Sequence, residues 1–500
     1  MKKIMLYGCL MAASCMPYVD ADQTSFKVAD ATTSPAAPTA TAVPPATATT
    51  TAPDNKAVDE LAPHFFTLKN GMQMIVKPDH RAPTAVHMVW NRVGAMDEVS
   101  GTTGVAHVLE HMMFKGTPTV KAGEFSRRVA ALGGDENAFT TDDYTAYYQQ
   151  IPKDKLEEVM KLESDRFVNN EWPDEEFKKE LEVVKEERRM RTEDRPRSLL
   201  YEQLMAATYT AHPYHNPIIG WMTDLDNLTA NDARAFYKKW YNPLNAVLVV
   251  AGDVNPEEAR ALAEKYYGVL PTHPVEARKV VIEPTQTAMR ALAVKAPADQ
   301  PYLLMSFKVP QLRNVENPTP SDWEALTLTV LSAILDGNDG SRFERNIINS
   351  ENRIADSAST SNGLYGRGPQ LFFVEGVPAK GKTITDLQAA LRAQIKKVAD
   401  EGVSDAELQR VKTQWIASEV YQRDSVYSQA NELGALWAVG LPLDTKDRMI
   451  EMLRKITPDQ VKAVAQKYFG EDQMTVAVLN PQPRDPNAKP RTPPAGMRHD

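Results

Sequence analysis

Cysteine is nearly absent from this sequence of 500 residues, which limits how the protein can be held together. The only two cysteines, Cys9 and Cys15, lie in an N-terminal segment that has the pattern of an export signal. Once residues 1–21 are removed, the chain has no disulfide, although an exported protein is free to form one. We therefore expect the packing of a large apolar core to stabilise the fold.

No membrane-spanning run is predicted either. The N-terminal apolar run of ten residues, from Ile4 to Ala13, is too short for a permanent span. Two lysines precede it and small residues ending at Ala21 follow it, as expected for a signal peptide of residues 1–21. An alternative is that Cys15 accepts a lipid anchor. The sequence therefore predicts an exported protein without a membrane span, either soluble or attached as a lipoprotein.

The chain also lacks an excess of positive charge. Its formal net charge is −9, and its basic residues form no stripe along the sequence. Because nucleic acid is bound through clustered Lys and Arg, we expect no nucleic-acid partner.

Bulky apolar side chains are rare near both ends of the chain. Residues 22–57 are dominated by Ala, Thr and Pro, and residues 481–500 are rich in Pro and polar side chains. Such segments cannot bury enough apolar surface to fold, which predicts a disordered linker and a disordered tail. The residues between them are too many for one core. We expect two domains, 58–275 and 289–480, joined by a linker at 276–288.

The clearest chemical signal is His107-Val-Leu-Glu110-His111. In a helix the two histidines lie on one face about 40° apart, and Glu110 lies about 60° to the other side of His107. His-x-x-Glu-His is the inverzincin order of a zinc-protease helix. Two imidazoles and a third ligand hold Zn²⁺, one position stays open for water, and the carboxylate takes a proton as that water attacks.

A solvated polar face is the alternative interpretation of this His/Glu/His cluster. The neighbouring residues argue against it, because they make the helix apolar nearly all round. They are Val105, Ala106, Val108, Leu109, Met112, Met113 and Phe114. Such a helix is expected to be buried, where three ionisable groups need a strong partner such as a metal ion.

A glutamate-rich helix from Phe177 to Met190 supplies candidates for the third ligand. Glu180 lies in the middle of its apolar face, and Glu187, seven residues on, is only about 20° away. Glu182 and Glu186 fall among basic residues on the opposite face and are expected to be solvated. An alternative is a structural network in which Arg191 pairs with Glu180.

The end of the first half of the chain is repeated in the second half. Residues 229–241 align without gaps to residues 457–469, and an apolar strand follows each copy, at 245–251 and 473–479. Predicted strands and helices also form separate clusters along the chain. These patterns predict an α+β fold made of two homologous, duplicated halves.

Further short motifs accompany the two helices. They are Gly133-Gly-Asp-Glu-Asn-Ala-Phe-Thr140, His212-Pro-Tyr214, Ile219-Gly220 and Tyr241-Asn-Pro-Leu-Asn-Ala-Val-Leu-Val-Val-Ala-Gly-Asp253. With segments 104–117 and 180–187, they resemble the pitrilysin/insulinase family of zinc metallopeptidases, in particular bacterial members similar to mitochondrial processing peptidase. The resemblance covers essentially the whole folded chain and is dense in the first half. It implies two α+β half-domains, each with a mainly antiparallel sheet flanked by helices, and with the export signal it implies a periplasmic bacterial enzyme.

The resemblance also implies a zinc endopeptidase with one Zn²⁺ per chain. It makes Glu187 the third ligand beside His107 and His111, in agreement with the helical periodicity. Glu110 then activates water and protonates the leaving amine. Glu180 is implied to support the catalytic site by orienting a ligand.

The substrate implied by the resemblance is an extended or unfolded peptide that adds to a sheet edge. The strand at 137–141 provides that edge, with Asn137, Ala138 and Phe139 as the binding residues. One alternative is a protease dedicated to the maturation of a single peptide. Another is a non-catalytic structural subunit of the same family, but such a subunit lacks Glu110 or a metal ligand, and none is missing here.

The second half does not complete the site by itself. In the family, a self-sufficient enzyme carries an Arg and a Tyr, seven residues apart, that hold the substrate over the zinc. Counted from the turn Gly340-Ser-Arg-Phe343, these positions fall at Ile348 and Ala355, neither of which can donate a side-chain hydrogen bond. We therefore expect a heterodimer with a related chain that lacks zinc ligands but carries the pair, unless Arg353 or Tyr365 replaces it.

Overall fold

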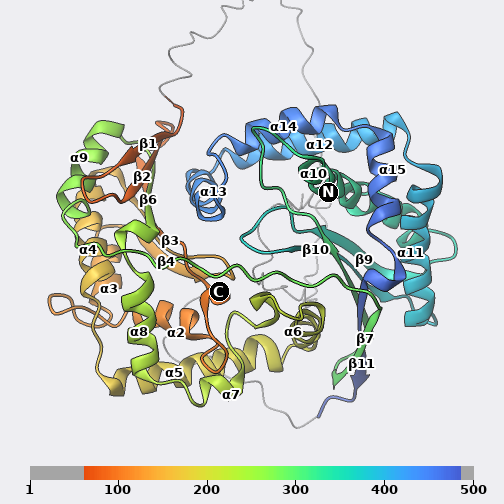
Figure 1. Cartoon of the computed structure of the whole chain (residues 1–500), viewed down its shortest axis with the longest axis horizontal. Coiled ribbons are helices and arrows are strands. Elements are labelled where there is room, and N and C mark those ends of the chain that lie inside the picture. The colour runs from red at the N-terminus through yellow and green to blue at the C-terminus, as the bar shows by residue number, and fades with distance from the viewer. Residues whose placement is uncertain (1–60, 486–500) are drawn as a thin grey trace, which may run out of the picture.

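The computed structural model describes residues 61–485, and two β-sheets organise this part of the chain (Figure 1). The first is a 6-stranded sheet in the order β1-β2-β6-β3-β5-β4, and the second is a 5-stranded sheet in the order β7-β11-β8-β10-β9. The strands are β1 (His64–Thr67), β2 (Gln73–Pro78), β3 (Thr84–Asn91), β4 (Asp135–Thr140), β5 (Thr145–Pro152), β6 (Ala246–Gly252), β7 (Arg290–Pro297), β8 (Tyr302–Val309), β9 (Ala355–Asn362), β10 (Gln370–Pro378) and β11 (Met474–Gln482).

The second sheet repeats the plan of the first. Apart from β1, the order β2-β6-β3-β5-β4 corresponds strand by strand to β7-β11-β8-β10-β9. Each sheet has one parallel pair, β2 with β6 and β7 with β11. The other neighbouring strands of both described sheets are antiparallel. The expected α+β fold, with two duplicated halves and mainly antiparallel sheets, is confirmed.

Helices flank both sheets and give each half its own apolar core. In the first half they are α2 (Val105–Met112), α3 (Glu124–Ala131), α4 (Leu156–Asn169), α5 (Asp174–Arg188), α6 (Pro196–Thr208), α7 (Met222–Leu225), α8 (Ala230–Trp240) and α9 (Pro256–Tyr266). In the second half they are α10 (Pro320–Asp336), α11 (Ile384–Glu401), α12 (Asp405–Gln422), α13 (Val426–Val439), α14 (Thr445–Lys455) and α15 (Pro458–Lys467). Every residue of β6 is buried, because helices cover both faces of this central strand.

The segments that align in sequence also fold alike. Thr229 caps α8, and Thr457 caps α15. In each copy the hydroxyl accepts a hydrogen bond from the amide three residues on, and the side chain of that residue bonds back to the backbone of the cap. A central strand then follows each helix, β6 and β11 respectively. The sequence repeat therefore reflects a repeated structural unit.

Each half contributes one helix to the sheet of the other half. Helix α13, from the second half, packs on β3 and β6 of the first sheet (Figure 1). Its Gly434 lies so close to Trp90 that a β-carbon there would come within 2.1 Å of the indole ring. Helix α6, from the first half, packs on β7, β8 and β11, where Leu200 and Leu204 are buried. The two halves are therefore joined through apolar contacts on both sheets.

An irregular connection crosses from α9 to β7, drawn as a green trace in Figure 1, and it contains the predicted linker 276–288. The predicted start of the tail at 481 is wrong, since β11 continues to Gln482 by pairing Pro481 and Gln482 with β7. The predicted signal 1–21, the linker 22–57 and residues 486–500 lie outside the described residues. Among residues 61–485, no helix is long and apolar enough to cross a membrane.

Candidate metal centre

Helix α2 carries the His-x-x-Glu-His motif, and all of its residues are buried. The helix follows Gly104, whose φ is 86° and whose β-carbon would lie 2.6 Å from the carbonyl oxygen of Ile219. Only glycine fits such a position without strain. The Glu98 carboxylate accepts hydrogen bonds from the amides of Gly104 and Ala106, both at 2.8 Å. It thereby satisfies amides at the start of the helix that have no partner within it.

Helix α5 turns Glu180 and Glu187 toward α2. Both residues are buried, together with the apolar residues of the same helical face. In contrast, the side chain of Glu182 is 66% exposed and that of Glu186 is 25% exposed, and each pairs with a basic neighbour. Glu180 and Glu187 are therefore buried on the predicted face, whereas Glu186, which was expected to be solvated, is only partly exposed.

The two helices bring His107, His111 and Glu187 together. The Glu187 carboxylate lies 3.8 Å from His107 Nε2 and 3.3 Å from His111 Nε2. One ligand atom from each residue lies within 4.8 Å of the other two, and all three residues are buried. A tetrahedral Zn²⁺ holds its nitrogen and oxygen ligands about 3.3 Å from one another, close to the two distances between Glu187 and the imidazoles. Two imidazoles and a carboxylate are also a ligand set used by catalytic zinc.

The charges of this group favour a bound cation. Burial opposes ionisation of Glu187, but the positive charges of His107, His111 and Arg191 outweigh it and lower the pKa of Glu187 to about 2. Burial also opposes protonation of His111, but its hydrogen bonds with Glu180 and Glu187 raise the pKa of His111 to about 9. The buried carboxylates therefore stabilise positive charge at His111, which a proton provides without metal and which a metal ion would provide in its place.

The sequence left open a structural network in which Arg191 pairs with Glu180. The structure shows an ion pair of Arg191 with Glu187, in which the guanidinium lies 2.9 Å from Glu187 Oε1. The chain after α5 continues as a π-helical turn, Arg189–Glu193, which contains Arg191. A carboxylate has several lone pairs, so an ion pair with Arg191 is compatible with Glu187 binding a metal through another lone pair.

Glu180 orients one of the imidazoles. Its Oε1 atom lies 2.9 Å from His111 Nδ1, and its other oxygen forms an ion pair with Lys115. When Nδ1 donates its proton to this carboxylate, Nε2 presents its lone pair to the metal site. The sequence predicted the supporting role of Glu180 but not Lys115, which lies four residues after His111, beyond the end of α2.

Glu110 lies on the same helix and is 1% exposed. The hydroxyl of Thr140 donates a hydrogen bond to Glu110 Oε2 at 2.5 Å. Thr140 is the last residue of β4, next to the residues predicted to bind substrate. The sequence pattern does not indicate this contact, although Thr140 is the last residue of the motif Gly133–Thr140.

Strand β4 forms one edge of the first sheet. Within residues 61–485 it pairs with β5 on one side, and no strand lies on the other. Ala138 is buried in the core that includes α2, whereas Phe139 packs on Trp90 across the sheet. Asn137 is half-buried. The predicted substrate-binding residues therefore lie on an edge strand that contacts helix α2.

The second half has no counterpart of these groups at the aligned positions. Its helix α10 is an apolar packing helix, as predicted. Ile348 ends a π-helical turn, and Ala355 begins β9. Arg353 pairs with Asp356 at 2.9 Å and has a side chain that is 53% exposed. Tyr365 is part of the second apolar core, where burial raises the pKa of its hydroxyl.

Comparisons with known proteins agree with this geometry. The family model described as "Insulinase (Peptidase family M16)" matches residues 73–221, which include all the metal-centre residues. The model described as "Peptidase M16 inactive domain" matches residues 227–415.

Two bacterial proteins are similar in sequence over most of their length. "Zinc protease PqqE" of Helicobacter pylori is 29% identical over 423 residues, which cover 83% of this chain and 92% of that protein. "Uncharacterized zinc protease YmxG" of Bacillus subtilis is 25% identical over 422 residues, which cover 84% of this chain and 99% of that protein.

Solved structures have the same arrangement of two halves. A crystal structure of a protease from Helicobacter pylori has a TM-score of 0.78 at 27% identity, and the match covers 84% of this chain and 100% of that one. The periplasmic protease PqqL of Escherichia coli has a TM-score of 0.71 at 20% identity, a likeness of fold, and the match covers 85% of this chain and 49% of that one. The resemblance seen in the sequence motifs is confirmed: the chain belongs to the pitrilysin/insulinase family of peptidases, family M16.

Proposed function

We propose that this protein is a zinc-dependent endopeptidase that hydrolyses extended or unfolded peptides, with one Zn²⁺ per chain. The observation that carries the proposal is the buried group of His107, His111 and Glu187, with Glu110 on the same helix as the two histidines. A family member that has lost catalysis has no need to keep both a complete ligand set and this carboxylate.

The residues around the metal have distinct roles in this proposal. Zn²⁺, when bound by His107, His111 and Glu187, supplies a Lewis acid that polarises the scissile carbonyl and lowers the pKa of water. Glu110 accepts the proton of the attacking water and later gives it to the leaving amine. The hydrogen bond from Thr140 holds the Glu110 carboxylate in one orientation.

The peptide is proposed to bind along β4 as an added strand. Backbone hydrogen bonds from the edge formed by Asn137, Ala138 and Phe139 recognise an extended chain with little dependence on its sequence. The position of β4 supports this, because Thr140 at its end contacts Glu110. A peptide along this edge therefore passes the catalytic carboxylate.

We further propose that the chain is the catalytic subunit of a heterodimer. The partner is a family member that lacks zinc ligands and supplies the Arg/Tyr pair. Ile348 and Ala355 stand at the aligned positions of this chain, and Arg353 pairs with Asp356, next to Ala355 on β9. The test compares peptidase activity of the chain alone with that of the chain co-expressed with a family partner. Full activity of the isolated chain, lost in Arg353→Met or Tyr365→Phe, would contradict this part of the proposal.

Export to the periplasm is also proposed, with cleavage after Ala21 or lipidation of Cys15. Mass spectrometry of the mature N-terminus distinguishes Asp22 from a lipid-bearing Cys15. Either product contains no cysteine pair, so reductant leaves its thermal midpoint unchanged. A midpoint that falls in dithiothreitol would contradict both cleavage assignments.

The decisive experiment for catalysis is metal analysis of the freshly purified protein beside Glu110→Gln. We expect one zinc per chain in both proteins, and peptidase activity, measured with the co-expressed partner present, only in the wild type. Glu186→Gln is the matched control, because it removes the same charge from a partly exposed carboxylate on α5 that pairs with Arg189. Absence of zinc from the wild-type protein, or retained activity in Glu110→Gln, would overturn the proposal.

A further inference from the structure

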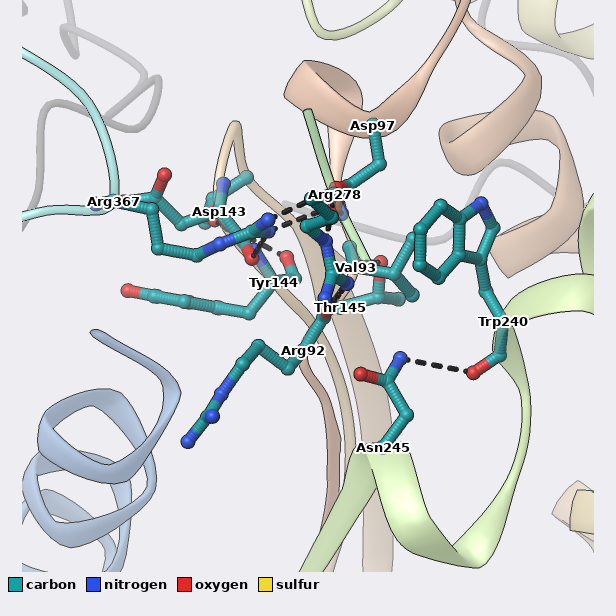
Figure 2. Close-up of polar contacts among 12 residues, drawn as sticks. Arg92, Val93, Asp97, Asp143, Tyr144, Thr145, Trp240, Asn245, Arg278 and Arg367 are labelled. Atoms are coloured by element: carbon teal, nitrogen blue, oxygen red, sulfur yellow. Dashed lines mark hydrogen bonds and ion pairs between the residues drawn. The ribbon is translucent and has the colours of Figure 1, made fainter. Parts of the chain in front are cut away.

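A buried polar junction ties the second half of the chain to the first. Its central residue is Arg367, in the loop between β9 and β10 (Figure 2). The Arg367 guanidinium donates two hydrogen bonds to the Asp97 carboxylate, at 2.7 and 2.9 Å. It donates a third to the carbonyl oxygen of Asp143 at 2.7 Å, and the backbone amide of Arg367 donates to Asp143 Oδ2 at 3.0 Å. One residue of the second half therefore binds two segments of the first.

The junction is shielded from water. The side chains of Arg367 and Asp97 are 10% and 3% exposed. Arg278, from the connection between the halves, approaches the same Asp97 carboxylate (Figure 2). Its Nε atom donates a hydrogen bond to Asp97 Oδ1 at 2.6 Å. Buried charges are stable only when they are paired, and a bidentate Arg–carboxylate pair fixes orientation as well as distance. Removal of the Arg367 guanidinium would take away its hydrogen bond to the Asp143 carbonyl oxygen. Of the two arginines that bind the Asp97 carboxylate, only Arg278 would remain.

The His-Pro-Tyr motif at residues 212–214 contacts the loop that carries Arg367. The Tyr214 hydroxyl donates to the Asp143 carboxylate and accepts a hydrogen bond from the amide of Gly368 at 2.8 Å. A β-carbon on Gly368 would lie 2.3 Å from His212 Cε1, so the loop fits only with glycine there. The connection between the halves also binds this motif, because Glu283 accepts a hydrogen bond from the His212 amide at 2.9 Å. A motif with no role in the metal centre thus belongs to the junction.

Both segments bound by Arg367 lead directly to the catalytic groups. Asp143 belongs to the turn between β4 and β5, which begins one residue after Thr140. Asp97 belongs to the segment 94–98, whose last residue, Glu98, caps α2. The two segments also bond to each other, through the amides of residues 95 and 96 and the carbonyl oxygens of residues 141 and 142, each at 3.0 Å. Arg367 therefore holds the end of the edge strand against the start of the metal-bearing helix.

We propose that Arg367 is a positioning residue for catalysis, supplied in cis by the second half of the chain. It keeps the β4–β5 turn in place, and through that turn it keeps Thr140 and the edge strand aligned with Glu110. The inference rests on the proposed peptidase function of this site. It adds that the half without metal ligands contributes to the chemistry by fixing the geometry of the half that has them.

The first test is amide hydrogen exchange of the full chain, measured without substrate. In Arg367→Met we expect amides of residues 135–144 to exchange about tenfold faster or more, because the turn loses its anchor. The matched control is Arg342→Met. Arg342 has a side chain that is also 10% exposed and forms a bidentate pair with Glu407 at 2.8 and 3.0 Å, but within the second half. Its loss is expected to leave exchange of residues 135–144 unchanged.

Kinetics and metal binding complete the test, using the active form of the enzyme. Arg367→Met should lower kcat about tenfold or more while zinc affinity stays within about threefold, since the ligands come from α2 and α5. Arg367→Lys, which keeps the charge but not the bidentate pair, should lie between Arg367→Met and wild type. If Arg367→Met does not fold, Arg367→Lys is compared with Arg342→Lys by the same criterion. Unchanged exchange of residues 135–144, or equal acceleration in the Arg342 variant, would overturn the inference. Because exchange needs no substrate, this outcome is separate from a failure of the proposed peptidase activity.

Discussion

Two adjacent glutamates on α5 provide a sharp test of the metal centre. Glu187→Gln and Glu186→Gln make the same chemical change one residue apart. The Glu187 side chain is fully buried, and its carboxylate lies 3.3 Å from His111 Nε2 and 3.8 Å from His107 Nε2. Glu186 has a side chain that is 25% exposed, and it pairs with Arg189 at 3.0 Å.

The expected magnitudes follow from these environments. Loss of a residue that only supports a ligand typically lowers metal affinity about 10–100-fold. Glu187→Gln removes the only anionic ligand of the three, so we expect a loss of more than about 100-fold, or about 2.7 kcal/mol at 1.36 kcal/mol per tenfold change. Glu186→Gln breaks a partly exposed ion pair, which contributes about 0–1 kcal/mol to folding and nothing to the metal site. Its zinc affinity should stay within about threefold of wild type.

The assay is competition for Zn²⁺ against a chromogenic chelator of known affinity. Circular dichroism of both variants without metal checks that they are folded. Similar losses in the two variants would mean that α5 presents a different face to α2. A small loss in Glu187→Gln alone would mean that another residue supplies the third ligand.

The remaining predictions concern the supports of the site and the core beneath it. Lys115→Met should lower zinc affinity about tenfold, because Glu180 loses the cation that pairs with it, while Lys115→Arg should retain the affinity. Equal zinc affinities of Lys115→Met and wild type in the competition assay would refute this. Thr140→Val removes the hydroxyl that donates to Glu110, so it should lower kcat about tenfold with zinc content unchanged, and Thr140→Ser should restore the rate. An unchanged kcat in Thr140→Val would refute the role of the hydroxyl. His87 is fully buried, and burial lowers its pKa from 6.5 to about 4. Between these values the unfolded chain binds more protons, so the free energy of unfolding should fall by about 2–3 kcal/mol as pH decreases from 6.5 to 4. Denaturant melts of wild type and His87→Gln at several pH values measure this, and equal pH dependence of the two would contradict it.

Several features of the protein were determined by the sequence alone. The His-x-x-Glu-His helix, the face of α5 that carries Glu180 and Glu187, and the duplication of the chain follow from local patterns. A helix repeats its face every 3.6 residues, so periodicity distinguishes Glu187 from Glu186 without any knowledge of the partner helix. The repeat of a capped helix and a central strand is likewise readable from residues 229–251 and 457–479.

Other features were decided only by the tertiary structure. Lys115 contacts Glu180 from beyond the end of α2, and Thr140 contacts Glu110 from the end of β4, where local periodicity no longer predicts direction. The junction of Arg367 with Asp97 and Asp143 joins residues more than two hundred positions apart, as the separations of 270 and 224 residues show. Helices α6 and α13 each pack on the sheet of the other half, which depends on where that sheet lies. Strand β11 extends to Gln482 because β7 lies beside it. Such contacts depend on how whole elements pack and register against one another, which the pattern within a single element does not specify.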